Sequence, residues 1–300
     1  MELISPTTNI DFIRSVKSAV CVSLALILAG LLSLWYRGGL NYGVDFAGGT
    51  VVQVKFTQPA TIADIRRALE APDLTELTVQ DFGQGGDEFL IRLPVGEEGV
   101  TELSEQVRQG LVQAFGPQTF EIRKVETVGP KVGKELRWKA CLAVTVATLM
   151  MGIYIAVRFE LRFGVGALLA LVHDVLMTLG ALSLMDMEFD LTVVAALLTV
   201  VGFSINDTVI VCDRIRENMR QLRRESIGTI INRSINETLS RTLITNGTAL
   251  ISVSTLFLFG GEVIEAFAFA LLVGFIAGTY SSIYIASPVV LLWEGTGMRR

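Results

Sequence analysis

The chain has 300 residues, of which 51% are hydrophobic and only 18% are charged. This composition is too apolar for an ordinary soluble domain and is typical of a protein that crosses a membrane several times. The formal net charge of −5 argues against a nucleic-acid partner, and a single histidine excludes a histidine-rich metal site. We therefore expect a multispanning protein in contact with lipid and without a resident metal or cofactor.

Six apolar runs are each long enough for a helix of about 20 residues, which is the length that spans a bilayer. They leave one large polar segment between the first run and the second. The expected parts are a cytoplasmic N-terminus at 1–16, a first transmembrane helix at 17–36, an α/β domain at 37–138, and a five-helix domain at 139–300, with helices at 139–157, 164–184, 190–212, 243–260 and 265–292 and a basic cytoplasmic loop at 213–242.

The positive charges of the short loops predict the orientation. Lys and Arg precede the first run and separate the second from the third and the fourth from the fifth, whereas the loops at 185–190 and 260–265 have neither. By the positive-inside rule, both termini are expected in the cytoplasm and the segment 37–138 on the far side of the membrane. The basic loop 213–242 is interpreted as a helix near anionic lipid headgroups or as a docking surface for a partner.

The polar segment 37–138 has the pattern of a small α/β domain. From Thr50 to Phe56 apolar residues alternate with a period of two, which predicts a strand. Further strands are expected at 77–82, 88–93 and 120–128, with a turn at 83–86 and helices at 61–72 and 101–116. The order β-α-β-β-α-β is that of a ferredoxin-like unit.

The fourth apolar run contains Ser204, Asn206 and Asp207. An Asp at the centre of a transmembrane helix costs about 2.5 to 3.5 kcal/mol on insertion scales, so a proton or ion site is the expected reason for Asp207. Ser204 lies one turn earlier and is a candidate hydrogen-bond donor to Asp207. The alternative is a packing contact, in which Asn206 and Asp207 bond to neighbouring helices.

His173 and Asp174 form a second polar group, near the middle of the third run. Asp174 is a candidate to exchange protons together with Asp207 if the two carboxylates line one cavity. His173 is expected to be a hydrogen-bonded packing residue.

Arg241 precedes the fifth run, followed by Thr245 and Asn246. Its side chain either extends to the membrane interface or is a fixed cation whose pairing with Asp207 depends on protonation. The residues alone leave both interpretations open.

No nucleotide or hydrolase motif is visible. The glycines at 48–49 and 83–86 lack the G-x-x-x-x-G-K spacing of a phosphate-binding loop, and the single histidine lies in an apolar run. The chain is therefore expected to be a membrane protein of the secondary-transport type and not an enzyme.

Five motifs in this order resemble the SecF family of bacterial protein translocase subunits. They are NYGVDFAGGT (41–50), VGPKVGKEL (128–136), VHDVLMTLG (172–180), VVGFSINDTVIVCDRIREN (200–218) and NETLSRTLITNGTAL (236–250). The first motif contributes Gly43, Asp45, Gly48 and Gly49 of the polar domain.

The resemblance implies an accessory subunit of the Sec machinery in the bacterial inner membrane, related to resistance-nodulation-division transporters. With SecD as its other half, such a subunit uses the proton-motive force, or sodium in some organisms, to promote export of unfolded polypeptides. SecYEG, YajC and YidC are implied as further partners. Asp207 matches the family's proton-binding aspartate, Arg241 matches the arginine that acts with it, and Asp174 lies in a family motif. Two alternatives remain: a proton-driven exporter of small molecules or lipids, and a passive scaffold of the translocase.

Overall fold

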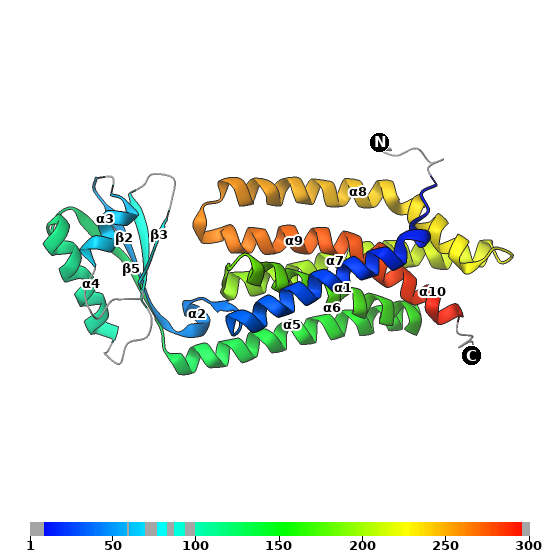
Figure 1. The fold of residues 1–300 in the computed structure, drawn as a ribbon, viewed down its shortest axis with the longest axis horizontal. Helices are drawn as coiled ribbons and strands as arrows, with labels where there is room; N and C mark the ends of the chain where they lie inside the picture. The colour runs from blue at the N-terminus through cyan, green and yellow to red at the C-terminus, as the bar shows by residue number, and fades with distance from the viewer. Residues whose placement is uncertain (1–8, 59, 70–76, 83–86, 94–99, 296–300) are drawn as a thin grey trace.

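The computed structural model describes residues 9–58, 60–69, 77–82, 87–93 and 100–295. A long helical bundle is joined at one end to a smaller α/β domain, and the first and last described residues lie toward the other end (Figure 1). The predicted N-terminal segment is thus described only from residue 9, and the last part of the predicted helical domain, 296–300, lies outside the described residues.

Within the described residues, six helical stretches are long and apolar enough to cross a membrane, which confirms the predicted number of spans. They are α1 (Phe12–Arg37), α5 (Pro130–Arg158), α6 (Leu161–Leu184), α7 (Leu191–Gln221), α8 (Ile227–Phe259) and the stretch Glu262–Glu294. The last stretch consists of the 3-10 turn η1 (Glu262–Ile264), α9 (Glu265–Ser281), the π-helical turn η2 (Ser282–Ala286) and α10 (Ser287–Gly295).

Helices α7 and α8 are longer than a bilayer requires. They have 31 and 33 residues, which at 1.5 Å per residue is about 46 and 50 Å, against about 30 Å for a hydrocarbon core. Both helices extend beyond the rest of the bundle at the end opposite the α/β domain (Figure 1). Much of the predicted basic loop 213–242 is therefore helix, with only 222–226 between α7 and α8.

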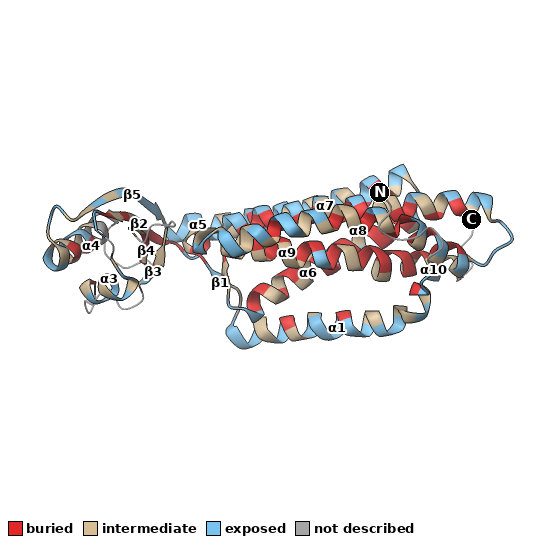
Figure 2. Cartoon of the chain, turned by 90° about the horizontal axis from the view of Figure 1, so that it is seen from above, coloured by how far each residue is buried: buried red, intermediate tan, exposed pale blue. Residues whose placement is uncertain are grey.

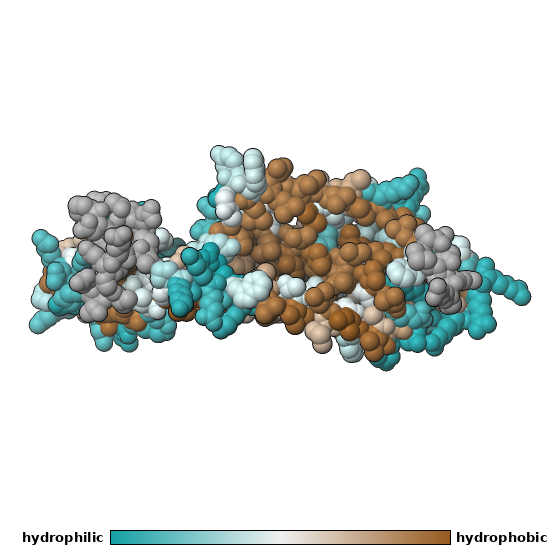
Figure 3. Space-filling model, turned by 90° about the horizontal axis from the view of Figure 1, so that it is seen from below, coloured by the Kyte–Doolittle hydropathy of each residue, from teal (hydrophilic) through white to brown (hydrophobic). Residues whose placement is uncertain are grey.

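Helices α6, α7 and α9 form the buried centre of the bundle, and α1, α5 and α8 are more exposed (Figure 2). Glycines allow α1 to approach α6 closely, because a Cβ atom on Gly30 would lie 2.5 Å from the Cα of Gly180. The face of the bundle that Figure 3 shows is largely apolar between two hydrophilic ends. Leu32 on α1 and Ile153 on α5 are 62% and 55% exposed. An exposed apolar surface of this kind is typical of a surface that contacts lipid or partner helices.

The α/β domain is built on one antiparallel sheet with the strand order β3-β4-β2-β5. Its elements are β2 (Gly49–Phe56), α3 (Ile62–Ala68), β3 (Thr78–Asp81), β4 (Glu88–Leu93), α4 (Val100–Phe115) and β5 (Phe120–Val128). Val52, Ile65, Ile91 and Val107 belong to a separate apolar core between the sheet and the two helices. The predicted turn at 83–86 and the end of the predicted helix 61–72 lie outside the described residues.

A short segment joins the domain to the bundle. Strand β1 (Asn41–Tyr42) pairs in parallel with β6 (Glu188–Phe189), which lies directly before α7. The four-residue helix α2 (Val44–Ala47) follows β1, and its Phe46 ring stacks on Phe189 with 5.5 Å between ring centroids. The segment that precedes β2 is therefore held against the start of α7.

Candidate functional site

Helix α7 places Asp207 inside the bundle. The helix is capped by Asp190, whose side chain accepts a hydrogen bond from the backbone N–H of Val193. Asp207 is 1% exposed. Its Oδ2 atom accepts a hydrogen bond from Nδ2 of the buried Asn246 on α8, and the same nitrogen donates to Thr279 Oγ1 on α9 at 2.6 Å. Asn246 thus joins the carboxylate on α7 to both neighbouring helices.

Three buried oxygen atoms in this region have no hydrogen-bond partner among the described residues. They are Asp207 Oδ1, Asn246 Oδ1 and Thr242 Oγ1. An unpartnered buried acceptor costs about 1–3 kcal/mol, and more if it is charged. A proton on Asp207, or a small hard cation held by these oxygens, would relieve part of that cost. Nowhere in the described part of the chain do three or more His, Cys, Asp or Glu side chains group as a metal site.

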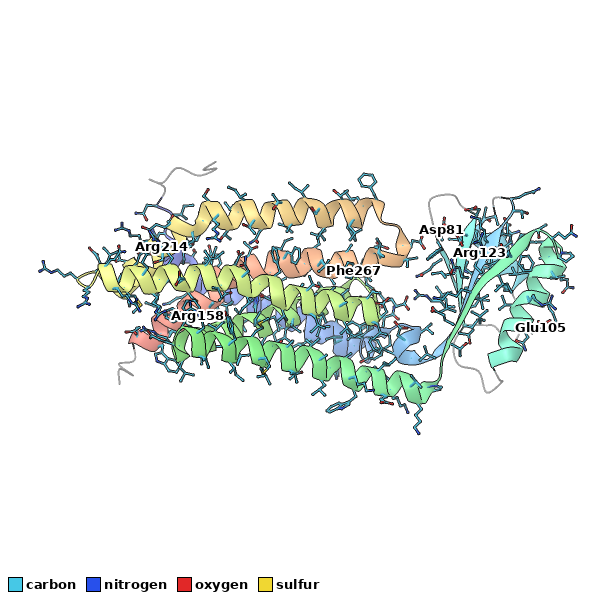
Figure 4. All side chains as sticks on the ribbon, turned by 180° about the vertical axis from the view of Figure 1, so that it is seen from behind. Asp81, Glu105, Arg123, Arg158, Arg214 and Phe267 are labelled. Carbon is cyan, nitrogen blue, oxygen red and sulfur yellow. The ribbon has the colours of Figure 1, made fainter. Side chains whose placement is uncertain are left out.

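Arg241 makes no direct ion pair with Asp207 in this structure. Its side chain is exposed and, among the described residues, has no carboxylate within 4.0 Å. Its charge nevertheless acts on Asp207 electrostatically. Arg241 lines a cleft of about 480 Å³ together with Arg158 and Arg214, and Figure 4 shows the latter two at the bundle end away from the α/β domain. Pairing of Arg241 with Asp207 would require a rearrangement.

Asp174 on α6 occupies a second, separate polar site. It is fully buried, with Oδ1 at 3.0 Å from His173 Nδ1. Its Oδ2 accepts hydrogen bonds from Ser204 Oγ at 2.6 Å and Ser281 Oγ at 2.9 Å. The prediction that Ser204 donates to Asp207 is therefore wrong. Residues three apart differ by about 60° around a helix, and this turns Ser204 towards α6 while Asp207 contacts α8. In the described part of the chain, the two carboxylates share no hydrogen-bond partner.

His173 extends the second site to α1. Its Nε2 atom lies 3.1 Å from Ser23 Oγ, and its ring stacks on Tyr280 at 6.0 Å between centroids. Ser23 Oγ donates to Tyr280 Oη at 3.2 Å, and Tyr280 Oη donates to the carbonyl oxygen of Ala19 at 2.6 Å. His173 is thus buried and hydrogen-bonded to side chains on α6 and α1, and its interpretation as a packing residue stays a prediction.

Two other predicted polar residues stand apart from both sites. Asn206 is exposed, and its side chain makes no hydrogen bond within the part of the chain that the structure describes. Thr245 is half-buried; within the described ranges its carbonyl oxygen accepts a hydrogen bond from Thr248 Oγ1, and its side chain makes none. In that part of the chain, neither Asn206 nor Thr245 bonds to Asp207.

The glycine-rich motif of the polar segment lies beside the start of α7. Asp45 Oδ2 accepts a hydrogen bond from the backbone N–H of Leu191 at 3.1 Å. Gly48 and Gly49 have φ angles of 85° and 143°, which side chains with a Cβ rarely adopt. Gly43 N–H donates to the carbonyl oxygen of Phe189 at 2.9 Å. The motif therefore contacts the helix of Asp207 at its N-terminal end.

Sequence reasoning did not identify the hydroxyl groups that complete the two sites. Thr279, Tyr280 and Ser281 follow one another in the sixth run, and Ser23 interrupts the first. The signal that could have identified them is the presence of polar side chains within an apolar run. Their partners depend on which helices pack together, which the runs do not specify.

Family models for protein export match most of the chain. The model "Protein export membrane protein SecD/SecF, C-terminal" matches residues 108–296, and the model "SecD/SecF GG Motif" matches residues 38–60. The second match covers the glycine-rich motif that lies beside α7.

Curated and solved relatives agree with these matches. Protein translocase subunit SecF of Calditerrivibrio nitroreducens is 47% identical over 97% of this chain and 96% of its own length. Protein translocase subunit SecF of Desulfurispirillum indicum is 48% identical over 95% of this chain and 92% of its own. The crystal structure of SecDF, a translocon-associated membrane protein from Thermus thermophilus, has a TM-score of 0.81 and 36% identity. The match covers 98% of this chain and 40% of the SecDF chain.

Proposed function

We propose a function from the premise that this chain belongs to the SecD/SecF family of protein-export membrane proteins. It acts as the SecF-type subunit of a bacterial protein translocase and uses an ion gradient to promote export of polypeptides across the cytoplasmic membrane. The observation that carries the coupling role is Asp207, a buried carboxylate on a spanning helix with one oxygen unpartnered among the described residues. A buried ionisable group within a spanning helix is energetically costly, and such groups typically bind and release a proton or an ion during transport.

SecD is the partner that this function requires. The solved SecDF chain is longer, and this chain matches 40% of it. The exposed apolar faces of α1, α5 and α8 supply surface for partner helices. Contacts with the SecYEG channel, YajC and YidC belong to the same proposal.

The mechanism is a charge switch at Asp207. Asn246 holds the charged carboxylate, and binding of a proton changes that contact and lets α7 and α8 repack, with Arg241 as the nearby fixed cation. One charge that crosses 100 mV yields about 2.3 kcal/mol, which biases a two-state equilibrium by tens of fold. The α/β domain then moves about its two connections to the bundle, at 38–45 and 129–136.

We propose the orientation in the membrane on the basis of the loop charges. Both termini lie in the cytoplasm and the α/β domain lies outside, where it meets the emerging polypeptide. We assign this domain to the ferredoxin-like class, because the sheet order β3-β4-β2-β5 and the helices α3 and α4 agree with a split β-α-β unit. The coupling ion is a proton, with sodium as the alternative that the oxygen-rich surroundings of Asp207 also suit.

Export by reconstituted vesicles tests the proposal. The chain is combined with SecD and the channel, and export is measured with and without an imposed proton gradient or sodium gradient. Asp207→Asn should remove the ion-stimulated part by more than about tenfold, because the carboxylate can no longer change its charge. Asp213→Asn is the control, since Asp213 lies on the same helix and is exposed.

Full retention of ion-stimulated export in Asp207→Asn, at native levels of assembly, contradicts the proposal. A passive scaffold would work normally with Asp207→Asn and Arg241→Ala combined and would fail only when the chain is missing.

A further inference from the structure

The α/β domain is tied to the bundle by a partly buried ion pair. Arg92 on β4 contacts Glu188 on β6 through Nη1 and Oε2, and the two side chains are 18% and 25% exposed. Glu188 lies three residues before Leu191, the first residue of α7. The pair therefore connects the sheet to the segment that leads into the helix of Asp207.

Two more carboxylates surround Arg92, and each is bonded to the start of α7. Asp45 Oδ2 accepts from Leu191 N–H at 3.1 Å, and Asp190 Oδ1 accepts from Val193 N–H at 2.9 Å. Burial lowers the pKa of the Arg92 guanidinium from its ordinary value, and the charges of Asp190 and Asp45 oppose this change. The guanidinium stays charged at physiological pH. We name Asp45, Arg92, Glu188 and Asp190 the junction.

The backbone around the junction is fixed by the glycine-rich motif. Strand β1 pairs with β6, so Glu188 sits opposite Asn41. A Cβ on Gly43 would lie 2.5 Å from Glu188 Oε1, and the absence of that atom makes room for the carboxylate beside Arg92. A role in seating Glu188 accounts for a glycine at this position.

Two clefts border the ion pair at the interface between the α/β domain and the bundle. A cleft of about 570 Å³ and one of about 250 Å³ are both lined by Arg92 and Glu188. Their remaining walls come from the sheet, from α2 and from the loops at 185–190 and 260–265. The ion pair therefore borders two clefts near the start of α7, while β3 contacts η1 elsewhere at this interface.

We propose that Arg92 is a positioning residue for energy coupling, whose ion pair with Glu188 transmits movement of α7 to the sheet of the α/β domain. The inference rests on the proposed function, because it takes Asp207 as the origin of the movement. Asp207 lies 16 residues from Leu191, which is about 24 Å along a helix. A rigid helix carries a displacement over that length, and the junction passes it to β4.

Loss of Arg92 leaves the domain folded and attached. The apolar core of the domain does not include Arg92, and the β1–β6 pair and the Phe46–Phe189 stacking remain. Arg92→Met keeps an unbranched apolar side chain and removes the guanidinium group with its charge. Three carboxylates near the start of α7 then lose their cation, so the contact between sheet and loop opens.

Distance measurement between two spin labels tests the transmission. Exposed sites at Gln109 on α4 and Tyr36 on α1 are changed to cysteine, and the native Cys21 and Cys141 are changed to serine. The labelled chain is studied in lipid together with SecD. Asp207→Asn, an uncharged mimic of the protonated residue, should shift the distance distribution. Adding Arg92→Met should abolish this shift, and adding Arg123→Met, a charge removed from the exposed strand β5, should not.

A charge exchange tests whether the loss of the shift is due to the ion pair itself. Arg92→Glu combined with Glu188→Arg should restore the shift, whereas Arg92→Glu alone should not. Ion-stimulated export should fall about tenfold in Arg92→Met, within the range typical of coupling between sites, while export without a gradient stays unchanged.

The outcomes distinguish this inference from the function on which it rests. A shift that persists in Arg92→Met overturns the role of Arg92 and leaves the function standing. A chain in which Asp207→Asn causes neither a shift nor a loss of ion-stimulated export overturns the proposed function, and the inference with it.

Discussion

Asp174 and Asp207 are both buried in the bundle, but they differ in how many hydrogen-bond partners they have. Asp174 is contacted by His173 and accepts hydrogen bonds from Ser204 and Ser281, so both of its oxygens have partners. Asp207 has one donor, Asn246, and one oxygen without a partner among the described residues. Both side chains are buried and lie on central helices of the bundle, so the degree of burial does not distinguish the two carboxylates.

The difference lies in how completely each carboxylate is satisfied. A fully partnered buried charge fixes one arrangement of its helices, because any movement leaves several polar groups unpaired. Movement of a carboxylate with an unpaired oxygen breaks fewer hydrogen bonds, and a proton or ion bound to that oxygen lowers its free energy. We therefore interpret Asp174 as the group that holds α1, α6, α7 and α9 together, and Asp207 as the group that changes its state.

The largest expected effect is on stability at Asp174. Asp174→Leu leaves His173, Ser204 and Ser281 without their acceptor, and the free energy of unfolding should fall by about 3–5 kcal/mol. Among the described residues, Asp207→Leu removes one hydrogen bond, from Asn246, which keeps its bond to Thr279, so the change should cost about 1–2 kcal/mol. Thermal unfolding of both variants in the same detergent measures the difference. Equal losses of stability in the two variants would contradict the proposed difference between Asp174 and Asp207.

Ser204→Ala should have an intermediate effect. The substitution removes a 2.6 Å hydrogen bond to Asp174 Oδ2, and bonds to charged groups are worth about 1.5–3 kcal/mol. Stability should fall by that amount, while the sodium or proton concentration for half-maximal export stays the same. A changed ion dependence at unchanged stability would instead assign Ser204 to the site of Asp207.

Thr242→Val is the substitution for which no loss of stability is expected. Because Thr242 Oγ1 is buried and has no partner among the described residues, its replacement by a methyl group of similar size breaks no hydrogen bond and should leave the free energy of unfolding unchanged or raise it. The ion concentration for half-maximal export should shift, since one oxygen near Asp207 is lost. If only stability changes, the hydroxyl does not belong to the ion site.

The sequence predicted the parts of this account that depend on local pattern. Apolar runs were sufficient to predict six spans, and a carboxylate within a run singled out both Asp174 and Asp207. The partners were harder to predict. Ser204 lies within a turn of Asp207 along the chain, yet it bonds to Asp174, because neighbouring positions on one helix face different helices. The contacts of Ser23 and Ser281 depend on the packing of α1 and α9, which no local pattern encodes.

Arg92 shows the same limit in the polar domain. Its position on a strand was predicted from the sequence at 88–93, but its contact with Glu188 joins residues that are far apart in the chain. The pairing of β1 with β6 and the stacking of Phe46 on Phe189 hold the two parts of the chain near each other. Long-range pairings of this kind are set by the fold as a whole.

Infrared difference spectroscopy tests the central claim most directly. The chain is reconstituted with SecD in lipid, and spectra are compared between acidic and neutral buffer. The account predicts a band from a buried carboxylic acid that disappears in Asp207→Asn and remains in Asp174→Asn. A band that remains in Asp207→Asn and disappears in Asp174→Asn would contradict it, because Asp174 would then be the group that takes up the proton.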